Sequence, residues 1–535
     1  MRNSSTFAFG CFALALFSLA SRGQAPAPGL RLYCQNSSLV TQLVDVNGTA
    51  IHTWTSAYNP GLGLRMLSDG KLLRSARIVG GPAIGGLGGA VQRFALNGTL
   101  EWEFHYHNTL HWSHHDVEPL PNGNVLIIAW DNWTVAEATA FGRTASLITG
   151  TVVRTDHIIE VQPTGPTTGT IVWEWHVKDH LIQDANASAG NFGVVAQHPE
   201  LVDINFPAIA SQAADINHAN GLYYDAQHDW IIISSHNQNE IWIIDHSTTT
   251  AQAAGHTGGQ RGRGGDLLYR WGNPQAYDAG TAANQMLYGQ HNPRRIPTGY
   301  PGAGNVTVFN NNYPGGSRAW EISLPMDSSG NFALVPGNAY GPAAPVWSYS
   351  AAGFTSANIS GCQRLPNGNT MICSGAQGRI FEVTPAGTLA WNHQPGGTIF
   401  HAQYVDRALW SSSPTLTLSG GGVVDFNLLT GTNHANEMYI VLASTSGTSP
   451  GFSLGGSVLP LNMDDLMLFT LNSANSAMLV NTFGVLNAQG EAQASLVLPP
   501  LAGLPAALQL HFAAALFNAS TITATSIAVP LTILP

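Results

Sequence analysis

The sequence predicts an all-β protein, and three of its features support this. Of its 535 residues, 58 are glycine and 30 are proline, so turns are frequent. Charged residues make up only 10%, and lysine, a good helix former, occurs only at Lys71 and Lys178. Short runs of Ile, Val, Trp and Tyr lie between the turns, as expected of strands. The length exceeds what one hydrophobic core usually supports, so we expect at least two domains.

The first 23 residues predict a secretory signal peptide. Arg2 precedes an apolar run over residues 7–20, and small residues follow up to Gly23, after which we expect cleavage. The apolar run is short for a membrane span, and no later stretch of the sequence supplies one. We therefore expect an exported protein, periplasmic or extracellular, without a membrane span.

A repeated unit runs from residue 30 to about residue 405. Its clearest copies begin with the turns Leu-Pro-Asn-Gly-Asn at residues 120–124 and 365–369, each followed by apolar strands. Each unit closes near a tryptophan, which gives six units that end at Trp54, Trp102, Trp175, Trp271, Trp347 and Trp391. Repeated units of four short antiparallel strands are typical of a β-propeller. We therefore predict a six-bladed β-propeller over residues 30–407.

The unit that is easiest to interpret lies between Asp215 and Asp245. It predicts three antiparallel strands, one beginning at His218 and the others at residues 230–235 and 241–245, with polar turns between them. Long insertions at residues 134–154, 180–213 and 247–265 interrupt the middle units. Such insertions either form a lid over one face or elaborate the surface.

The character of the sequence changes after about residue 407. Histidine nearly vanishes, and Ala, Leu, Ser and Thr alternate in strand-length runs between Gly-rich and Pro-rich turns. This pattern predicts a β-sandwich over residues 413–535. Because it holds no cluster of chemically reactive residues, we expect an accessory domain with a binding or structural role.

Two cysteines flank the second Leu-Pro-Asn-Gly-Asn turn. Cys362 and Cys373 are placed symmetrically about residues 366–369, so they are expected to face each other across a hairpin. In an oxidising compartment such a pair favours a disulfide. Their spacing is too wide and too poor in histidine for a zinc ribbon.

Three histidines occupy comparable positions at the starts of inner strands. His115 precedes Asn122 of its turn by seven residues, and His218 precedes Asp225 by the same number. The same offset from Asn367 gives Ser360, and His291 opens the fifth unit. In a propeller the innermost strands line a central channel, so equal offsets bring these residues to one mouth.

Three interpretations of this histidine group are open. With 20 histidines in the chain, any single one is more often a satisfied loop or surface residue. Three imidazoles are also what catalytic zinc uses, although no carboxylate stands at an obvious supporting position. A propeller that binds a ligand at this mouth without catalysis is a further alternative.

The motifs around these histidines resemble those of the bacterial arylsulfate sulfotransferases, over roughly residues 60 to 405. The resemblance rests on four segments: His114-His115-Asp-Val with its turn, Asp215-Ile-Asn-His218-Ala-Asn220, Ile233-Ser-Ser-His236 and Gly289-Gln-His291. The family implies a six-bladed propeller that moves a sulfuryl group between phenols without a nucleotide donor.

The resemblance also implies roles for individual residues. His291 matches the histidine that is transiently sulfated, while His115, His218 and Asn220 match residues that hold sulfuryl oxygens or shuttle protons. His236 stands where the best-known members carry an arginine, so the cation that clamps sulfate is missing or is replaced by Arg294 or Arg295. Protonated His236 would make donor binding depend on pH.

The predicted partners are a small aromatic sulfate donor and a phenolic acceptor, with no cofactor and no metal. The net charge of −11 argues against nucleic acid or an anionic membrane surface as the main partner. A neutral imidazole is a competent nucleophile, and sulfuryl transfer, like phosphoryl transfer, needs positioning and charge neutralisation. The sequence makes no prediction of the oligomeric state.

Overall fold

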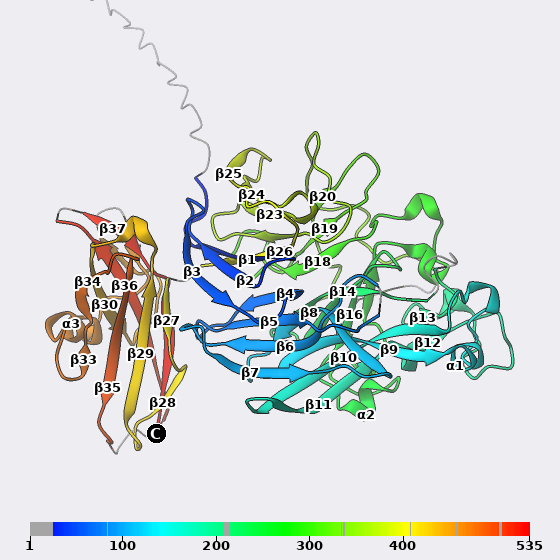
Figure 1. The fold of residues 1–535 in the computed structure, drawn as a ribbon, viewed down its shortest axis with the longest axis horizontal. Coiled ribbons are helices and arrows are strands. Elements are labelled where there is room, and N and C mark those ends of the chain that lie inside the picture. Colours follow the sequence, from blue (N-terminus) through cyan, green and yellow to red (C-terminus); the bar gives the residue numbers. More distant parts are fainter. Residues whose placement is uncertain are drawn as a thin grey trace, which may run out of the picture.

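A computed structural model describes residues 25–535 apart from 83, 208–213, 333, 335, 336, 407, 455, 456, 502–505 and 520. The predicted signal peptide lies outside the described residues. Figure 1 shows a larger body of strands and, beside it, a smaller one drawn in yellow to red, which holds the C-terminus. Strands dominate both bodies, so the expected all-β class is confirmed.

Within its described residues, the larger body contains six four-stranded antiparallel sheets, here called sheets 1 to 6. Sheet 1 is β26 (Ile399–Val405), β1 (Leu30–Gln35), β2 (Val40–Val44) and β3 (Ala50–Thr55). Sheet 2 is β4 (Pro60–Met66), β5 (Leu72–Arg77), β6 (Gly89–Phe94) and β7 (Leu100–His105). Sheet 3 is β8 (His111–Pro119), β9 (Val125–Thr134), β10 (Val152–Gly165) and β11 (Thr168–His176).

The remaining three sheets follow the same order along the chain. Sheet 4 is β14 (Ala219–Asp225), β15 (Trp230–Ser235), β16 (Glu240–Asp245) and β17 (Tyr269–Trp271). Sheet 5 is β18 (His291–Arg295), β19 (Val306–Asn310), β20 (Arg318–Ile322) and β21 (Trp347–Tyr349). Sheet 6 is β22 (Gly361–Arg364), β23 (Thr370–Ser374), β24 (Arg379–Val383) and β25 (Leu389–His393). The three strands expected between His218 and Asp245 are β14, β15 and β16.

One edge strand of each sheet faces a common channel. β4, β8, β14, β18 and β22 contact one another in this order, and β26 contacts both β22 and β4, so the ring closes. A cavity of about 170 Å³ is lined by residues from all six of these strands, among them Arg65, Glu118, Arg294 and Ala402. The closure depends on β26, a late strand that pairs with β1 near the start of the chain. The resulting arrangement is propeller-like.

The hydrophobic cores of the larger body lie between neighbouring sheets. One core joins side chains of sheets 3 and 4, and a second joins sheets 4 and 5. Both faces of an inner sheet are therefore buried, which explains why Trp230–Ser235 is apolar almost throughout rather than alternating. The closing residues Trp54, Trp102, Trp175 and Trp271 are nearly inaccessible to solvent.

Short elements occupy the predicted insertions. The first insertion contains α1 (Val135–Ala140) and the 3₁₀ helix η1 (Ala145–Leu147); Thr134 caps α1 through a reciprocal pair with Glu137. The second contains β12 (Leu181–Ile182), η3 (Val195–Gln197) and β13 (Val202–Asp203), and the third contains α2 (Thr250–Ala253). Other short 3₁₀ helices are η2 (Val177–His180), η5 (Pro274–Tyr277), η6 (Ala282–Asn284) and η7 (Gly375–Gln377). None of the described helices has the length and apolarity to span a lipid bilayer.

The smaller body consists of two main sheets that share one core. The first sheet is β27 (Leu409–Ser411), β29 (Gly422–Leu429), β35 (Glu491–Leu498) and β33 (Leu479–Val480). The second is β28 (Thr415–Thr417), β38 (Val529–Leu534), β36 (Leu508–Phe517), β30 (Met438–Ser444), β34 (Phe483–Val485) and β37 (Ile522–Thr525). Smaller elements are η8 (Thr432–His434), β31 (Phe452–Leu454), β32 (Ser457–Leu459) and α3 (Asp465–Asn472).

The predicted disulfide between Cys362 and Cys373 is wrong. Both thiols are free and buried. In the β22–β23 hairpin Cys362 pairs with Ile372, and Cys373 pairs with Gly361, so the two cysteines are one residue out of register. Neighbouring positions of a strand point to opposite faces. Cys362 accordingly packs in the core with Phe309, and Cys373 packs in a different core with Ile399.

Candidate active site

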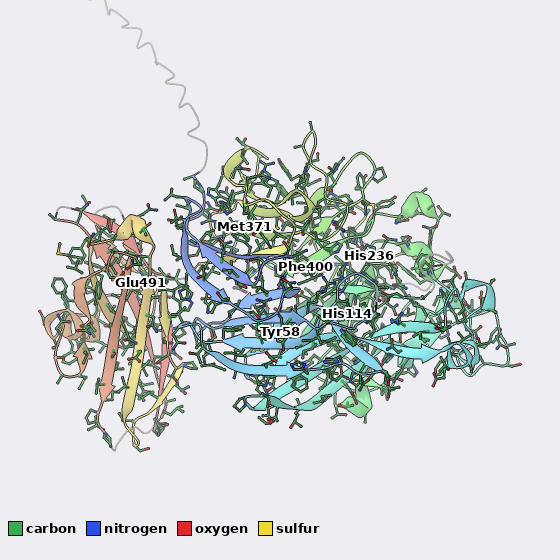
Figure 2. All side chains as sticks on the ribbon, in the orientation of Figure 1. Tyr58, His114, His236, Met371, Phe400 and Glu491 are labelled. Atoms are coloured by element: carbon green, nitrogen blue, oxygen red, sulfur yellow. The ribbon has the colours of Figure 1, made fainter. Side chains whose placement is uncertain are left out.

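Four histidines and one phenylalanine form a closed ring at one mouth of the channel. They are His115 on β8, His218 just before β14, His236 just after β15, His291 at the start of β18 and Phe400 on β26. Successive side-chain rings around this circle have centroids 4.8, 5.4, 5.7, 6.2 and 6.0 Å apart. Figure 2 labels His236, Phe400 and His114 near the middle of the larger body as seen in this view, and Phe400 and His114 are buried. We call this group the histidine ring.

The backbone around the histidine ring adopts uncommon conformations. His115 and His218 have φ values of +50° and +51°, and Ile359 and Ser360 beside them have +52° and +90°. Positive φ is costly for such residues and is concentrated at functional sites. The chain also comes very close to the ring, because a Cβ on Gly86 would lie 1.8 Å from the His115 imidazole.

His291 is held as a neutral imidazole with a defined orientation. Its Nδ1 lies 2.8 Å from Asn311 Oδ1 and 3.1 Å from the carbonyl oxygen of Gly289, so it donates its proton there. Nε2 accepts a hydrogen bond from the backbone N–H of Ile359 at 3.2 Å. Burial, reinforced by His236, lowers the pKa of His291 to about 3. Its Nε2 therefore carries a lone pair at neutral pH.

His218 is the member of the ring that holds a proton most readily. Burial alone would lower its pKa, but the Asp215 carboxylate, 2.6 Å from Nδ1, raises it above the usual value. Asp156 contributes in the same direction. His218 therefore supplies positive charge to the mouth, where an anionic substrate needs it.

His115 is connected to a buried carboxyl group through its neighbour. Its Nδ1 lies 2.8 Å from Nδ1 of His114, and Nε2 of His114 lies 3.0 Å from Asp156 Oδ1. Burial, together with Asp215, raises the pKa of Asp156 well above its usual value. Burial and the other ring histidines lower the pKa of His115 well below its usual value. The chain Asp156–His114–His115 therefore connects the mouth to a buried carboxyl group that favours its protonated form.

His236 lies in the ring but does not behave as the predicted sulfate clamp. Burial, together with the charge on His218, lowers its pKa to about 4. It is therefore mostly neutral near pH 7, which disfavours the expected protonated clamp, whereas the pKa of His218 is raised. Its Nδ1 lies 2.9 Å from Asn237 Oδ1, which fixes the imidazole orientation.

Asn220 and Ser360 lie next to the ring and hold its backbone. The Asn220 side chain donates to the carbonyl oxygen of Gln290 at 2.9 Å and so ties β14 to the segment that bears His291. The Ser360 hydroxyl donates to Ser356 Oγ at 2.7 Å and accepts from the Gly375 N–H at 2.9 Å. The Ser360 hydroxyl and the Asn220 amide nitrogen are thus engaged with the protein, whereas Asn220 Oδ1 is buried without a hydrogen-bond partner. The expected substrate contacts of both residues stay predictions.

Arg294 and Arg295, either of which we expected to replace the missing cation, are both paired with carboxylates. Arg294 pairs with Glu118 at 3.0 Å, and Arg295 pairs with Asp225 at 2.5 Å. A bulge between His291 and Arg294 sets the register of β18 against β19. Both guanidinium groups are therefore neutralised by carboxylates further along the inner strands.

Several residues of the site were missed by sequence reasoning. Phe400 closes the ring, but its strand is not followed in the sequence by a recognisable turn motif. Asp156 lies on the middle strand β10, and Asn311 follows β19, so neither shares the strand-start position that identified the histidines. Asp215, three residues before His218, was available as a signal, because this spacing suits a hydrogen-bonded acid–imidazole pair.

Among the described residues, two groups of histidine and aspartate have the geometry to hold a metal ion, and neither includes a member of the histidine ring. The ring therefore differs in arrangement from these candidate metal sites.

The chain was compared with known proteins, and no curated protein matches it. A solved protein of unknown function from Bacteroides caccae is 10% identical, with a TM-score of 0.39 over 71% of this chain and 99% of that one. The periplasmic gluconolactonase of Pseudomonas aeruginosa is 12% identical, with a TM-score of 0.37 over 70% and 99%. Likenesses this distant carry no argument about function. Residues 29–393, more than half of the chain, match the family described as Arylsulfotransferase (ASST). The chain belongs to the arylsulfotransferase family.

Proposed function

We propose that this protein transfers a sulfuryl group from an aryl sulfate donor to a phenolic acceptor through a sulfohistidine formed on His291. No nucleotide donor takes part. The family supports aryl sulfotransferase activity in general. The observation that supports the covalent route best is the state of His291, a buried neutral imidazole whose Nδ1–H is fixed by Asn311, while its Nε2 lone pair accepts only a 3.2 Å hydrogen bond from the Ile359 N–H.

In the first half-reaction Nε2 of His291 attacks the donor sulfur. A bond forms between this nitrogen and sulfur, the bond between sulfur and the aryl oxygen breaks, and the electron pair leaves on that oxygen. His218 protonates the leaving phenolate, because it is the ring histidine whose pKa is raised. The Ile359 N–H, released from Nε2, is then available to donate to a sulfuryl oxygen.

In the second half-reaction an acceptor phenol takes the place of the released phenol. Its proton passes to His218, its oxygen attacks the sulfur, and the electron pair of the broken nitrogen–sulfur bond returns to His291. His115 presents an N–H or a lone pair according to the protonation of Asp156 at the far end of its chain. His236 and Phe400 complete the wall of the site beside the aromatic substrate.

We further propose that sheets 1 to 6 are the six blades of one propeller over residues 30–407. The two-sheet body of residues 413–535 is then a β-sandwich that serves as an accessory domain. Export is supported by the apolar N-terminal sequence, which ends in small residues near Gly23. In this arrangement all catalytic groups come from the propeller.

The proposed activity is tested with purified full-length protein, an aryl sulfate and a second phenol. We expect the sulfate of the second phenol to form in the same amount as the first phenol is released, without any added nucleotide. If the first phenol is released while inorganic sulfate accumulates, the protein is a sulfatase rather than a transferase. If neither phenol changes, the protein is a binder and the proposal is wrong.

A further inference from the structure

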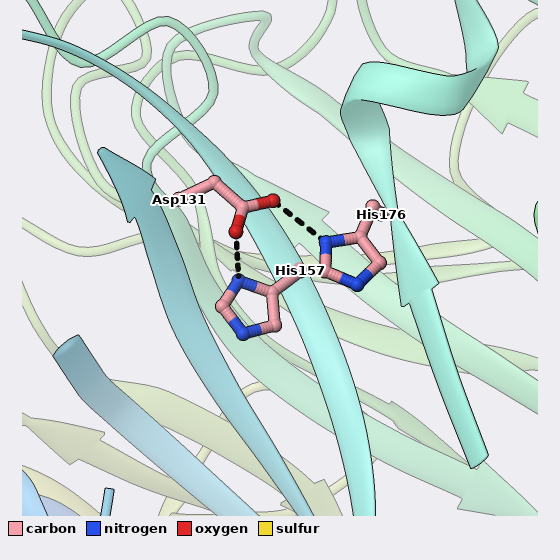
Figure 3. Close-up of side chains that lie close together, drawn as sticks. All are labelled: Asp131, His157 and His176. Atoms are coloured by element: carbon pink, nitrogen blue, oxygen red, sulfur yellow. Dashed lines mark hydrogen bonds and ion pairs between the residues drawn. The ribbon is translucent and has the colours of Figure 1, made fainter. Parts of the chain in front are cut away.

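A second group of ionisable side chains lies in sheet 3, outside the histidine ring. Asp131 on β9, His157 on β10 and His176 on β11 converge from three neighbouring strands (Figure 3). Nδ1 of His157 lies 3.3 Å from Asp131 Oδ1, and Nδ1 of His176 lies 2.7 Å from Asp131 Oδ2. His157 and His176 are paired across the strands, and their imidazoles stack with centroids 4.7 Å apart.

In both imidazoles Nδ1 faces the Asp131 carboxylate, because Nε2 lies near another oxygen. Nε2 of His157 lies 3.0 Å from the hydroxyl of Tyr106, and Nε2 of His176 lies 3.5 Å from Glu174 Oε2. If each Nε2 carries the proton, each Nδ1 has a free lone pair. In metal-binding histidines, the nitrogen that does not bind the metal donates its N–H to an oxygen, and this hydrogen bond fixes the orientation of the imidazole.

One atom of the group has no satisfactory partner within the protein. His157 is 1% exposed, yet its Nδ1 makes no hydrogen bond, although it points at Asp131. A buried polar atom without a partner is uncommon and calls for an explanation.

We propose that Asp131, His157 and His176 bind a divalent transition-metal ion, with Zn²⁺ as the best match. Two imidazole nitrogens and one carboxylate oxygen are a known zinc donor set, in which water takes the fourth position. Ligands of a tetrahedral zinc ion lie about 3.3 Å from one another at the usual bond lengths. The Nδ1 to Oδ1 separation of 3.3 Å at His157 already meets this requirement. His176 and Asp131 keep 16% and 14% of their side chains exposed, so an ion can enter.

Lys178 is the natural competitor for this position. Its Nζ lies 3.8 Å from Asp131 Oδ2, and its side chain is 37% exposed. A long, partly exposed lysine side chain can turn away into water when an ion enters. The site therefore has two states, one with Asp131 paired to His176 and Lys178 and one with the carboxylate on the metal.

The other candidate group in the described chain is a weaker one. His180 and His256 both direct Nδ1 to a single oxygen of Asp266, at 2.8 and 2.7 Å. Nε2 of His180 also lies 2.8 Å from the carbonyl oxygen of Ala253. Each contact of this group is satisfied within the protein, so it provides a matched control.

The metal would have a structural effect rather than a role at the mouth. It would join β9, β10 and β11 on one face of sheet 3, and Tyr106 would tie it to the segment after β7. On the middle strand β10, Asp156 of the histidine-ring chain and His157 of this group are adjacent and therefore face opposite sides of the sheet. Metal binding and sulfuryl transfer are therefore separable.

The test is calorimetric titration of ZnCl₂ into chelator-treated, full-length protein that carries no polyhistidine tag. We expect one ion to bind per chain and Tm to rise by about 2 °C or more at saturating zinc. His176→Gln should weaken binding by more than about 100-fold, and Tyr106→Phe should weaken it by about tenfold. Lys178→Met should tighten it by about threefold or more, because a competing charge is removed.

The control variants are His256→Gln in the other group and His291→Asn in the histidine ring, and both should bind zinc like the parent protein. The proposal is overturned if the parent protein binds no stoichiometric zinc, or if His176→Gln binds it unchanged. A site lost in His256→Gln instead would place the metal at Asp266. Should His176→Gln fail to fold, the opposite shifts expected for Lys178→Met and Tyr106→Phe decide the question.

Discussion

Two successive layers of side chains along the channel differ in how far their charges are neutralised by neighbouring groups. The upper layer is the histidine ring, and the lower layer is a group of arginines and carboxylates. The histidine ring has three imidazoles with lowered pKa values and one, His218, with a raised pKa. The next layer contains Arg65, which pairs with Asp116 at 2.8 Å and Glu118 at 2.6 Å, while Arg294 shares Glu118. Although burial opposes ionisation, Arg65 holds the pKa of Asp116 well below its usual range.

The difference supports the proposal that the histidine ring, here the upper layer, carries the reaction. Sequence neighbours fall into different layers: Asp116 follows His115, and His401 follows Phe400. Charges in the lower layer are paired with one another, so fewer of their polar groups are available to a substrate. The imidazoles of the ring have free or weakly occupied nitrogens in a strained backbone, as a site of group transfer requires.

Replacing His291, the proposed nucleophile in the upper layer, should have the largest effect on activity. His291→Asn keeps a polar side chain of smaller size at the start of β18, and we expect kcat for sulfuryl transfer to fall by roughly 10³-fold or more. Steady-state turnover of an aryl sulfate with a phenol measures this. Arg294→Gln in the lower layer is the comparison, and its kcat should change by less than about tenfold. Equal losses of kcat in both variants would contradict the proposal that only the upper layer takes part in the reaction.

Removing the carboxylate of Asp215, which pairs with His218, should have the next largest effect on activity. Asp215→Asn takes away the carboxylate that raises the pKa of His218, so the imidazole loses its proton at a lower pH. We expect kcat/KM at neutral pH to fall by roughly 10- to 100-fold. In the parent protein activity should decline as pH rises through the raised pKa of His218, and in the variant this decline should begin at lower pH.

The control for this variant is Glu437→Gln in the smaller body, where Glu437 pairs with His434 at the same spacing of three residues. Its pH profile should match that of the parent. A profile of Asp215→Asn that keeps the parent's alkaline limit would show that another group governs the protonated state.

Removing the smaller body should affect stability more than chemistry. A chain that ends at Ser412 keeps β26, which closes the ring of strands, and keeps Trp410, which packs in the core of sheet 1. It loses Leu429 from the same core, so we expect a lower Tm. Its kcat/KM with a soluble aryl sulfate should stay within about threefold of the full chain. A folded but inactive product would place part of the site in residues 413–535.

Chelation should have the smallest effect on activity. Treatment with EDTA should leave kcat unchanged, because the proposed chemistry uses imidazoles alone. The same treatment should lower the Tm of zinc-loaded protein, because the metal site in sheet 3 is separate from the mouth. Loss of turnover on chelation, restored by zinc, would instead support a zinc enzyme.

The sequence predicted the positions of the histidines because the repeat fixes where inner strands begin. His115 and His218 precede their turns by equal distances, and both reach the ring. The same reasoning failed where the face of the sheet to which a side chain points depends on the register between paired strands. Cys362 and Cys373 look symmetric about their turn, but the hairpin register places them one residue apart and on opposite faces.

Proximity along the chain was also a poor guide to proximity in the site. Arg294 lies three residues from His291 but belongs to the lower layer, because the bulge in β18 and the carboxylate of Glu118 draw it there. Phe400 comes from the strand that closes sheet 1 between the two distant ends of the propeller-like body. The lowered pKa of His236 results from burial by surrounding sheets, which no local pattern contains.

The measurement that tests the central claim most directly is incubation of the protein with the donor alone. We predict a burst of one phenol per chain and a labile sulfuryl group on His291, located by mass spectrometry of peptides prepared without acid. Addition of a phenol should then discharge the adduct, and initial rates should follow a ping-pong pattern. An adduct that still forms in His291→Asn would contradict the account and make His218 the first candidate for the nucleophile. Turnover without any burst or adduct would show that transfer is direct.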